Sequence, residues 1–341
     1  MTILVTGGAG YVGSHAVYAL EEAGREVAVV DDLSAGRREA VPPSVPLLVA
    51  DVADRPRVTA FLRERRVTAV LHFAARIQVG ESVVDPRRYY VGNVAASVAL
   101  LEACLDAGVN TFVLSSTAAV YGGAHPSPLT EDLAPAPSSP YGETKLAVER
   151  MLAAYAAAYG LRYAALRYFN AAGAAPERGL GERHEPETHL IPAALDVALG
   201  RRARLEVFGD DYPTPDGTCV RDYVHVLDLA DAHLAAVDHL ARGGEGGAFN
   251  LGAGVGRSVA EVAEAVRRVT GRPVPVAYGP RRPGDPAVLV ASPAKAERVL
   301  GWRARRSSLE RVVGDAWKFH ERAFARSGAR DTTPSHGAEH R

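Results

Sequence analysis

Short, mostly apolar runs recur along the first half of the chain and alternate with stretches of helical length. The runs predict buried strands, and the longer stretches predict the helices between them. The predicted strands are residues 3–5, 27–30, 47–50, 69–73, 111–115 and 162–169, and the predicted helices include 55–66, 89–107 and 144–159. This alternation predicts an α/β fold with a Rossmann-type doubly wound parallel sheet, which binds ligands at its carboxyl edge.

The pattern becomes less regular after Asn170. Residues 173–188 are rich in Gly, Pro, Glu and Arg and predict a loop, and short strands and helices follow at 205–208, 227–240, 259–270 and 274–278. We expect residues 1–170, with part of 221–245, to form the sheet domain. Residues 171–326 then form a smaller C-terminal α/β substrate-binding domain, and 327–341, which lack periodicity, a flexible tail.

Composition narrows the class of protein. The 341 residues are 47% hydrophobic and 23% charged, with a net charge of −1, so nothing in the charge favours nucleic acid or an anionic membrane. Cys104 and Cys219 are too few for a disulfide scaffold and lack metal-ligand spacing. We find no apolar stretch of the length that spans a bilayer, and we expect a cytoplasmic protein.

A glycine-rich turn follows the first predicted strand. Gly7, Gly10 and Gly13 recur every third residue, and Gly8, Gly10 and Gly13 satisfy the G-x-G-x-x-G spacing. Glycines there let the backbone approach a pyrophosphate, and the N–H groups of the following helix attract its charge. The position between a strand and a helix therefore predicts a dinucleotide site.

An acid ends the second predicted strand, where it can select the dinucleotide. Asp31 lies 18 residues after Gly13, where a carboxylate accepts hydrogen bonds from ribose hydroxyls and repels a 2′-phosphate. This favours NAD over NADP. Arg37 and Arg38 leave NADP open, because arginines after this strand can hold a 2′-phosphate.

Tyr141 and Lys145 are spaced to act together. At i and i+4 they share one face of a helix that Ser139-Pro140 can start. A phenol with a pKa of about 10 is a poor base at neutral pH, so a neighbouring ammonium and an oxidised nicotinamide should lower that pKa. Hydroxyls at residues 115–117 end a predicted strand and reach the same sheet edge.

The chain resembles the sugar-nucleotide epimerases of the extended short-chain dehydrogenase/reductase family over nearly its whole length, from Val5 to Trp302. The resemblance is carried by residues 10–15 (GYVGSH), 72–75 (HFAA), 79–83 (VGESV), 116–122 (STAAVYG), 166–170 (LRYFN), 208–218 (FGDDYPTPDGT) and 222–225 (DYVH). It implies an NAD-dependent isomerase that inverts C4 of a UDP-hexose, UDP-glucose or UDP-galactose, through a transient 4-keto sugar.

The resemblance also implies roles for individual residues. Tyr141 would be the base, Lys145 its partner and Thr117 the hydroxyl that shares the O4 proton. Cofactor contacts would come from Gly7, Gly10, Tyr11, Val12, Gly13, Asp31, Asp51, Val52, Phe73, Ala74, Ala75, Tyr141, Lys145 and Phe169. Substrate contacts would come from Thr117, Asn170, His189, Leu190, Phe208, Arg221, Arg282 and Asp285. His189 has no second ligand at a suitable spacing, so we expect no metal.

Several points stay open at the level of the sequence. Related dehydratases and decarboxylases carry an acid just after the Thr117 position, where this chain has Ala118 and Ala119, so we expect epimerisation rather than 4,6-dehydration. The hexose could be replaced by an N-acetylhexosamine, pentose or uronate, because Leu289 is intermediate in size at a position that gates the sugar pocket. Ile77 and Gly92 depart from the family pattern near the cofactor. Helices 89–107 and 144–159 resemble a dimer interface, which predicts a homodimer.

Overall fold

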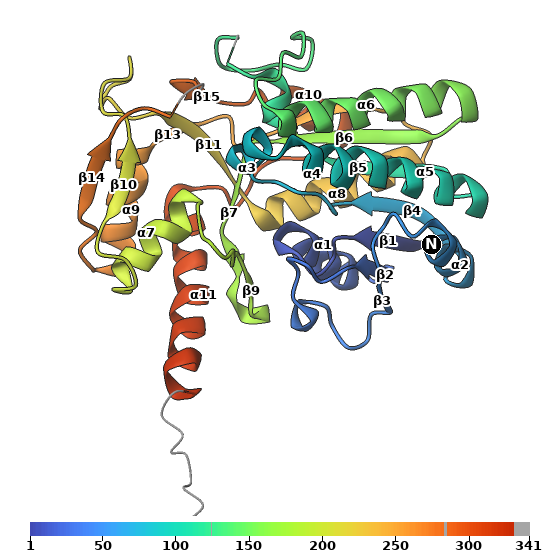
Figure 1. The fold of residues 1–341 in the computed structure, drawn as a ribbon, viewed down its shortest axis with the longest axis horizontal. Coiled ribbons are helices and arrows are strands. Elements are labelled where there is room, and N and C mark those ends of the chain that lie inside the picture. Colours follow the sequence, from blue (N-terminus) through green and yellow to red (C-terminus); the bar gives the residue numbers. More distant parts are fainter. Residues whose placement is uncertain (124, 283–284, 331–341) are drawn as a thin grey trace, which may run out of the picture.

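The computed structural model describes residues 1–123, 125–282 and 285–330. Its centre is a seven-stranded sheet in which every neighbouring pair is parallel (Figure 1). The strand order is β12-β6-β5-β4-β1-β2-β3. The strands are β1 (Thr2–Thr6), β2 (Glu26–Asp31), β3 (Leu47–Val49), β4 (Val67–His72), β5 (Thr111–Thr117), β6 (Arg162–Tyr168) and β12 (Gly247–Leu251). The predicted Rossmann-type doubly wound sheet is confirmed.

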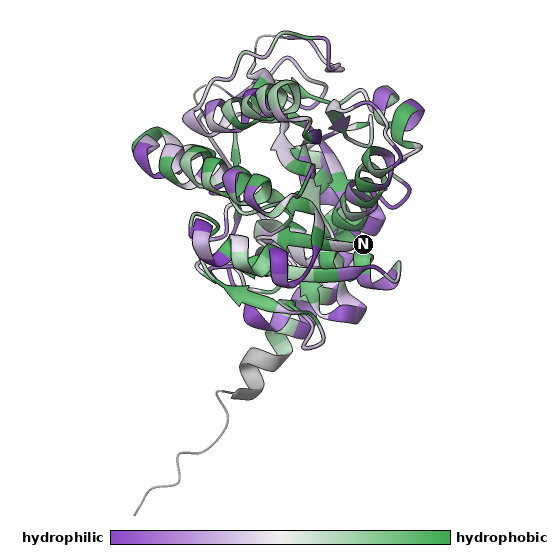
Figure 2. Cartoon of the chain, turned by 90° about the vertical axis from the view of Figure 1, so that its right-hand side faces the viewer, coloured by the Kyte–Doolittle hydropathy of each residue, from purple (hydrophilic) through white to green (hydrophobic). Residues whose placement is uncertain are grey.

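Helices cover both faces of this sheet, as the near-continuous apolar strands require. Helices α1 (Tyr11–Glu22) and α8 (Val226–Ala241) pack on one face, against Ile3 and Val5 among others. Helices α2 (Arg55–Glu64), α5 (Ala96–Ala107) and α6 (Pro140–Tyr159) pack on the other, against Leu4. Figure 2 shows apolar strands between helices whose outer faces are polar. Two successive residues of β1 thus serve two different cores.

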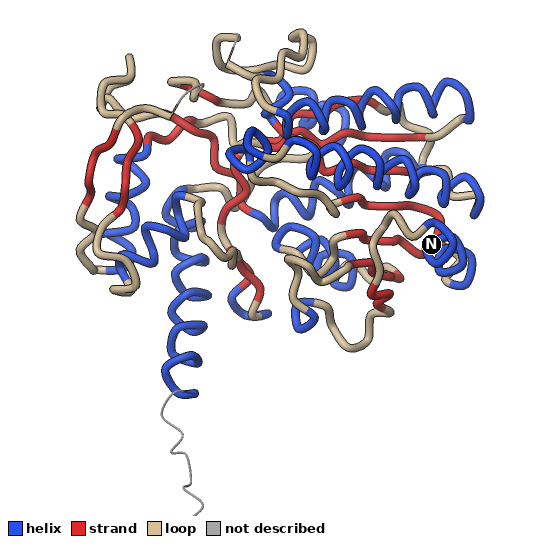
Figure 3. Tube along the Cα trace, viewed as in Figure 1, coloured by secondary structure: helices blue, strands red, loops and turns tan. Residues whose placement is uncertain are grey.

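A smaller α/β unit lies beside the carboxyl edge of the sheet (Figure 3). Its core is built by α7 (Leu190–Ala198), α9 (Val259–Thr270) and α11 (Leu309–Arg330) together with β10 (Leu205–Phe208) and β14 (Val276–Gly279). A second sheet joins β7 (Asn170–Ala172), β11 (Val220–His225), β13 (Gly256–Ser258) and β15 (Val288–Leu289). The short pieces β8 (Ala174–Ala175) and β9 (Leu180–Gly181) and helix α10 (Ala294–Leu300) complete this half. Because β7 follows β6 directly and pairs with β11, it ties the two units together.

The chain crosses between the units more than once. After β11 in the smaller unit it returns to the large sheet as α8, and β12 then pairs with β6 at the sheet's edge. The segment from 226 to 251 therefore packs with the large sheet. From the sequence we expected only part of residues 221–245 to join the sheet domain. Helix α11 runs to Arg330, beyond the predicted start of the tail at 327. Residues 331–341 lie outside the described residues.

One continuous helical run departs from the sequence expectation. It comprises α4 (Pro86–Tyr89), a π-helical segment (Tyr90–Ala95) and α5, and α3 (Val79–Val84) precedes it. By length and composition alone this run, Pro86–Ala107, could cross a membrane, although no such stretch was expected. Its inner face packs against α2 and α6 in the sheet domain, as a core helix does.

Candidate active site

The predicted site residues gather at the carboxyl edge of the large sheet. The loops after β1 and β4 meet there, at the point where the strand order reverses. They touch closely, because a Cβ added to Gly7 would lie 2.6 Å from the backbone nitrogen of Ala74. This crevice is where open α/β sheets bind their ligands. Gly7, Asp31, Ala74, Thr117 and the residues that follow β6 all stand at strand ends on this edge.

The glycine-rich turn has the geometry of a dinucleotide cradle. Gly7 has φ +69°, a left-handed conformation that favours glycine. A Cβ on Gly13 would lie 2.1 Å from the Gly7 carbonyl oxygen, so only glycine lets α1 begin this close to β1. Gly10 caps α1 without a side-chain hydrogen bond, which leaves the first N–H groups of the helix for an anion. These features fit a pyrophosphate.

Asp31 supports this turn from the end of β2. Its buried carboxylate accepts hydrogen bonds from the backbone N–H groups of Ala9 (2.9 Å) and Leu33 (2.8 Å). Burial raises the pKa of Asp31, and the two N–H groups oppose that rise. In this structure the carboxylate thus organises the turn, a role the sequence did not suggest. The other predicted cofactor residues, Asp51, Val52, Phe73, Ala74, Ala75 and Phe169, follow the ends of β3, β4 and β6.

Tyr141 is held in the first turn of α6. The Ser139 hydroxyl caps this helix by accepting from Gly142 N–H (3.2 Å), as the Ser-Pro start predicted. The Tyr141 backbone N–H donates to the Ser82 hydroxyl (3.2 Å), and the ring of Tyr89 meets the Tyr141 ring edge-on at 6.5 Å. Ser82 in α3 therefore holds the backbone of Tyr141, and Tyr89 in the helical run holds its ring.

Thr117 and Tyr141 are brought together as expected, but the predicted lowering of the tyrosine pKa is not found in the protein alone. Burial raises the pKa of Tyr141 to about 12, and the nearby Thr117 hydroxyl acts against this rise. Lys145 is buried, and its ammonium donates to the Ser115 carbonyl oxygen (2.9 Å). Burial lowers the pKa of Lys145 to about 8, and Glu149 opposes that change. Desolvation therefore sets the direction of the pKa shift at the phenol.

A buried polar layer that sequence reasoning missed lies behind Lys145. Glu149 forms an ion pair with Arg167 (2.6 Å) and accepts from the Ser116 hydroxyl. Arg167 also donates to the Tyr121 hydroxyl (2.9 Å), which donates to Asn250 (2.7 Å). Glu149 stands one helical turn after Lys145, as Lys145 does after Tyr141, so the i+4 spacing was a usable signal. Through Arg167 and Ser116, Glu149 holds the middle of α6 against the ends of β6 and β5.

The predicted substrate residues occupy the smaller unit and its junction with the sheet. Asn170 donates to the Asp222 carbonyl oxygen (3.0 Å), which joins β7 to β11. Arg221 lies 3.3 Å from the Asp285 carboxylate, and the Arg282 guanidinium stacks over the Phe208 ring at 4.0 Å. Arg221 and Asp285 thus form one pair of predicted substrate residues, and Arg282 and Phe208 form another. Leu289 packs with Phe169 beside Val120 and Tyr121, next to the Thr117 turn.

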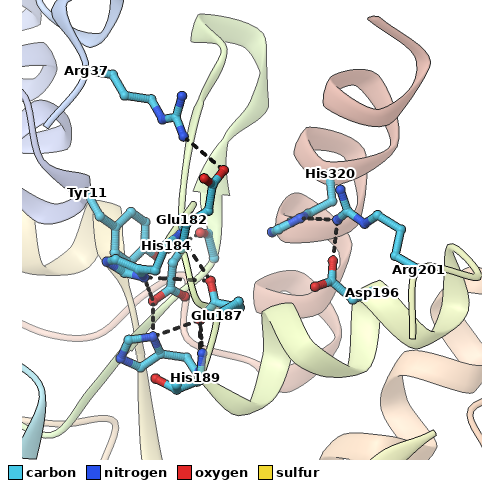
Figure 4. A network of polar contacts seen from close by, with 12 residues as sticks. Tyr11, Arg37, Glu182, His184, Glu187, His189, Asp196, Arg201 and His320 are labelled. Carbon is cyan, nitrogen blue, oxygen red and sulfur yellow. Dashed lines mark hydrogen bonds and ion pairs between the residues drawn. The ribbon is translucent and has the colours of Figure 1, made fainter. Parts of the chain in front are cut away.

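His189 has partners that the sequence analysis overlooked. Glu182, His184 and Glu187 place possible ligand atoms within 4.8 Å of one another and of His189, so the reason for expecting no metal there was wrong (Figure 4). Burial lowers the pKa of His184, but the two carboxylates outweigh it and raise that pKa to about 9. The E-x-H-x-x-E-x-H spacing was the missed signal. We refer to these four residues as the His–Glu cluster.

Comparisons with known proteins agree with this geometry. Residues 3–252 match the model of the NAD dependent epimerase/dehydratase family. A UDP-glucose 4-epimerase of Halalkalibacterium halodurans is 50% identical over 321 residues, covering 94% of this chain and 96% of its own.

Two solved structures extend the match. UDP-glucose 4-epimerase from Brucella ovis in complex with NAD has a TM-score of 0.90 at 48% identity, covering 93% of this chain and 97% of its own. The enzyme from Stenotrophomonas maltophila, solved with NAD and formylated UDP-arabinopyranose, has a TM-score of 0.92 at 43% identity, covering 96% and 99%.

Proposed function

Since the chain belongs to the NAD dependent epimerase/dehydratase family, we propose that it catalyses the NAD-dependent 4-epimerisation of a UDP-hexose, interconverting UDP-glucose and UDP-galactose. The observation that carries this proposal is that Thr117, Tyr141 and Lys145 stand at the end of β5 and the start of α6, on the sheet edge that also holds the glycine-rich turn. Ala118 and Ala119 offer no acid to eliminate water or carbon dioxide, so a 4-keto sugar formed there can only be reduced again.

The residues of the turn fit the cofactor. Gly7, Gly10 and Gly13 with the first turn of α1 would hold the pyrophosphate, and the segments after β2, β3 and β4 would line the rest. NAD, when bound there, supplies reversible hydride acceptance and a positive ring in its oxidised form. Asp31 supports NAD over NADP, because a second negative charge beside a buried carboxylate is unfavourable.

Side chains of the protein would remove the O4 proton and return it. Tyr141 removes this proton as the C4–H bond breaks, and returns it after the 4-keto sugar has turned over and been reduced on its other face. Thr117 can donate to and accept from the same oxygen, which lets the proton move along a short path. Lys145, mostly protonated at neutral pH, stabilises the phenolate that burial alone disfavours. The reaction is redox-neutral overall, because the sugar regains the hydride that it gave up.

Substrate recognition is proposed for the smaller unit. Arg221 and Arg282 carry planar guanidinium groups that suit a diphosphate. Asp285 neutralises Arg221 in this structure and would have to share it with the substrate. Asn170, His189, Leu190 and Phe208 are proposed contacts to the nucleotide. A panel of UDP-hexoses, their N-acetyl forms, pentoses and uronates would show what the Leu289 side chain admits.

Turnover of UDP-galactose tests the proposal. We expect UDP-glucose as the product, with no net formation of NADH. Tyr141→Phe removes the base and should lower kcat by roughly 10²–10⁴-fold while NAD stays bound. Tyr278→Phe is the matched control, because this tyrosine is exposed on β14, and it should leave kcat unchanged. Near-normal activity of Tyr141→Phe, or nucleotide binding without any turnover, would refute the assignment.

We further propose a homodimer and a cytoplasmic location. The helical run and α6 expose apolar side chains at Val91, Val98 and Tyr159, which water disfavours. Pairing of this face between two copies would cover them. Val91→Glu should halve the mass measured by light scattering, whereas Val255→Glu, on an exposed loop of the smaller unit, should not. A monomeric wild type would contradict the dimer.

A further inference from the structure

The His–Glu cluster gathers ligand chemistry for which the proposed reaction has no use. Glu182 follows β9, His184 and Glu187 lie in the loop beyond, and His189 directly precedes α7. The four side chains converge on one point, with both imidazoles facing both carboxylates (Figure 4). Their chain positions are close, but the loop must fold back to bring the first and the last together.

The nitrogen and oxygen atoms of the cluster are close enough to share one metal ion. His189 Nδ1 lies 3.1 Å from a Glu182 oxygen and 3.0 Å from a Glu187 oxygen. His184 Nδ1 lies 3.4 Å from the same Glu182 oxygen and 3.7 Å from the other oxygen of Glu187. Zinc bonds of about 2.0–2.1 Å at tetrahedral angles separate neighbouring ligand atoms by about 3.3 Å. The four distances lie on both sides of that value.

Burial and charge also call for a cation. The side chains of Glu182 and Glu187 are only 6% and 9% exposed, and within the described part of the chain their ion-pair partners are the two histidines, with no Arg or Lys among them. The Nδ1 atom of His184 is buried and has no hydrogen-bond partner there. Two buried carboxylates are unfavourable unless positive charge sits beside them, which either protonated histidines or a bound metal ion can supply.

We propose that the His–Glu cluster binds one divalent transition-metal ion, with Zn²⁺ the best fit. Two neutral imidazole nitrogens and two carboxylate oxygens neutralise a 2+ ion and complete a four-coordinate shell. Imidazole ligands favour Zn²⁺ and its neighbours, whereas Mg²⁺ and Ca²⁺ prefer shells made of oxygen. Binding displaces any protons held by the imidazoles, so metal uptake releases protons to the solvent.

The position of the cluster indicates a structural role. The Tyr11 hydroxyl donates to the Gly173 carbonyl oxygen (2.7 Å), and the charges of Glu182 and Glu187 act on the Tyr11 phenol, so the cluster borders the start of α1. His189 turns Nδ1 into the cluster, while 44% of its side chain stays exposed and Nε2 remains for another partner. The ion would hold this imidazole and the start of α7 in place. If the proposed function holds, losing the metal should raise KM for the UDP-sugar more than it lowers kcat.

Metal binding to the full-length protein tests the site without reference to catalysis. The protein is stripped with a chelator and titrated with Zn²⁺ by calorimetry, and with Co²⁺ as a visible-absorbing probe of tetrahedral geometry. We expect one ion per chain, with proton release and a higher Tm. His184→Gln and Glu187→Gln should each weaken binding by about 100-fold or more. Binding of Zn²⁺ by wild type no tighter than by these variants would overturn the proposal.

Control variants separate the cluster from other histidines. His125→Gln removes a partly exposed histidine elsewhere and should leave the stoichiometry at one. His336→Gln/His340→Gln, in the segment outside the described residues, should do the same. Transfer of the stoichiometric binding to that tail would contradict the proposal. An enzyme that binds the ion but does not turn over UDP-galactose would refute the proposed function alone.

Discussion

At the residue scale, the Thr117 hydroxyl is the group of the site whose replacement should be tolerated least. It lies at the end of β5, is 9% exposed, accepts from the Ala119 backbone N–H (3.1 Å) and acts on the Tyr141 phenol nearby. A hydroxyl can donate to one and accept from the other, which no apolar side chain of the same shape can do. The residue thus shapes the turn after β5 and is placed for the proposed proton path.

Two substitutions separate these contributions. Thr117→Val keeps the shape but removes the hydroxyl, and should lower kcat for UDP-galactose by roughly 10²-fold, as loss of a proton-sharing group does. Thr117→Ser keeps the hydroxyl and should stay within a few-fold of wild type. Steady-state kinetics measure both, and Tm with bound NAD content reports the fold. Equal loss in both variants would mean that the methyl group matters, not the hydroxyl.

The residue scale also shows where sequence reasoning stops. The spacing of Tyr141 and Lys145 placed both on one face of α6, as found. It did not reveal that Lys145 donates to Ser115 or that burial raises the pKa of the phenol. Helical periodicity follows from local geometry, whereas desolvation depends on everything packed around the group.

At the element scale, the turn between β1 and α1 tolerates little change. Gly13→Ala would place a methyl group 2.1 Å from a backbone oxygen that cannot move without disturbing the sheet. We expect a loss of stability of roughly 1–3 kcal/mol and weaker NAD binding. Denaturant unfolding and a cofactor titration measure the two effects.

A helical glycine elsewhere provides the control. Gly314 lies within α11, and a Cβ added there meets open space. Gly314→Ala should therefore stabilise the protein by roughly 0.5–1 kcal/mol without changing NAD affinity. If Gly13→Ala behaved like Gly314→Ala, the turn would not be the close-packed cradle described above.

The prediction of strands and helices worked best where the local apolar pattern alone specifies the element. The strands and helices of residues 2–72 carry local signals strong enough to be read directly. Strand β12 was missed because its partner β6 lies far away in the sequence, and pairing with a distant strand leaves no periodic mark. The helical run 86–107 was predicted to begin only at residue 89. Its true start at Asp85-Pro86 lies in a polar stretch, where no apolar periodicity marks a helix.

At the scale of the whole molecule, buried histidines set the response to acid. Burial lowers the pKa of His15 and His233 to about 4 and that of His72 to about 3. Each is neutral in the folded protein and takes up a proton on unfolding below a pKa of about 6.5. Because the folded pKa is the lower one, stability is present above about pH 6.5 and is lost as pH falls toward 4.

The expected loss is measurable. Between pH 7 and pH 5 each of these histidines should reduce the free energy of unfolding by about 2 kcal/mol. Urea unfolding at several pH values measures this, and His233→Gln should flatten the dependence. His125→Gln, which removes a histidine that is only partly buried, should not. A stability that is constant from pH 7 to pH 5 would contradict the neutral buried state.

The sequence by itself determined the sheet, the glycine-rich turn and the Tyr141–Lys145 pair, since short-range periodicity and spacing encode each of them. Only the tertiary structure decided how the two units interleave through β7 and β12 and which charges are buried. It also brought Glu149 to Arg167 behind Lys145 in α6 and closed the loop that joins Glu182 to His189. Burial and long-range pairing are properties of the packed chain, so no local pattern specifies them.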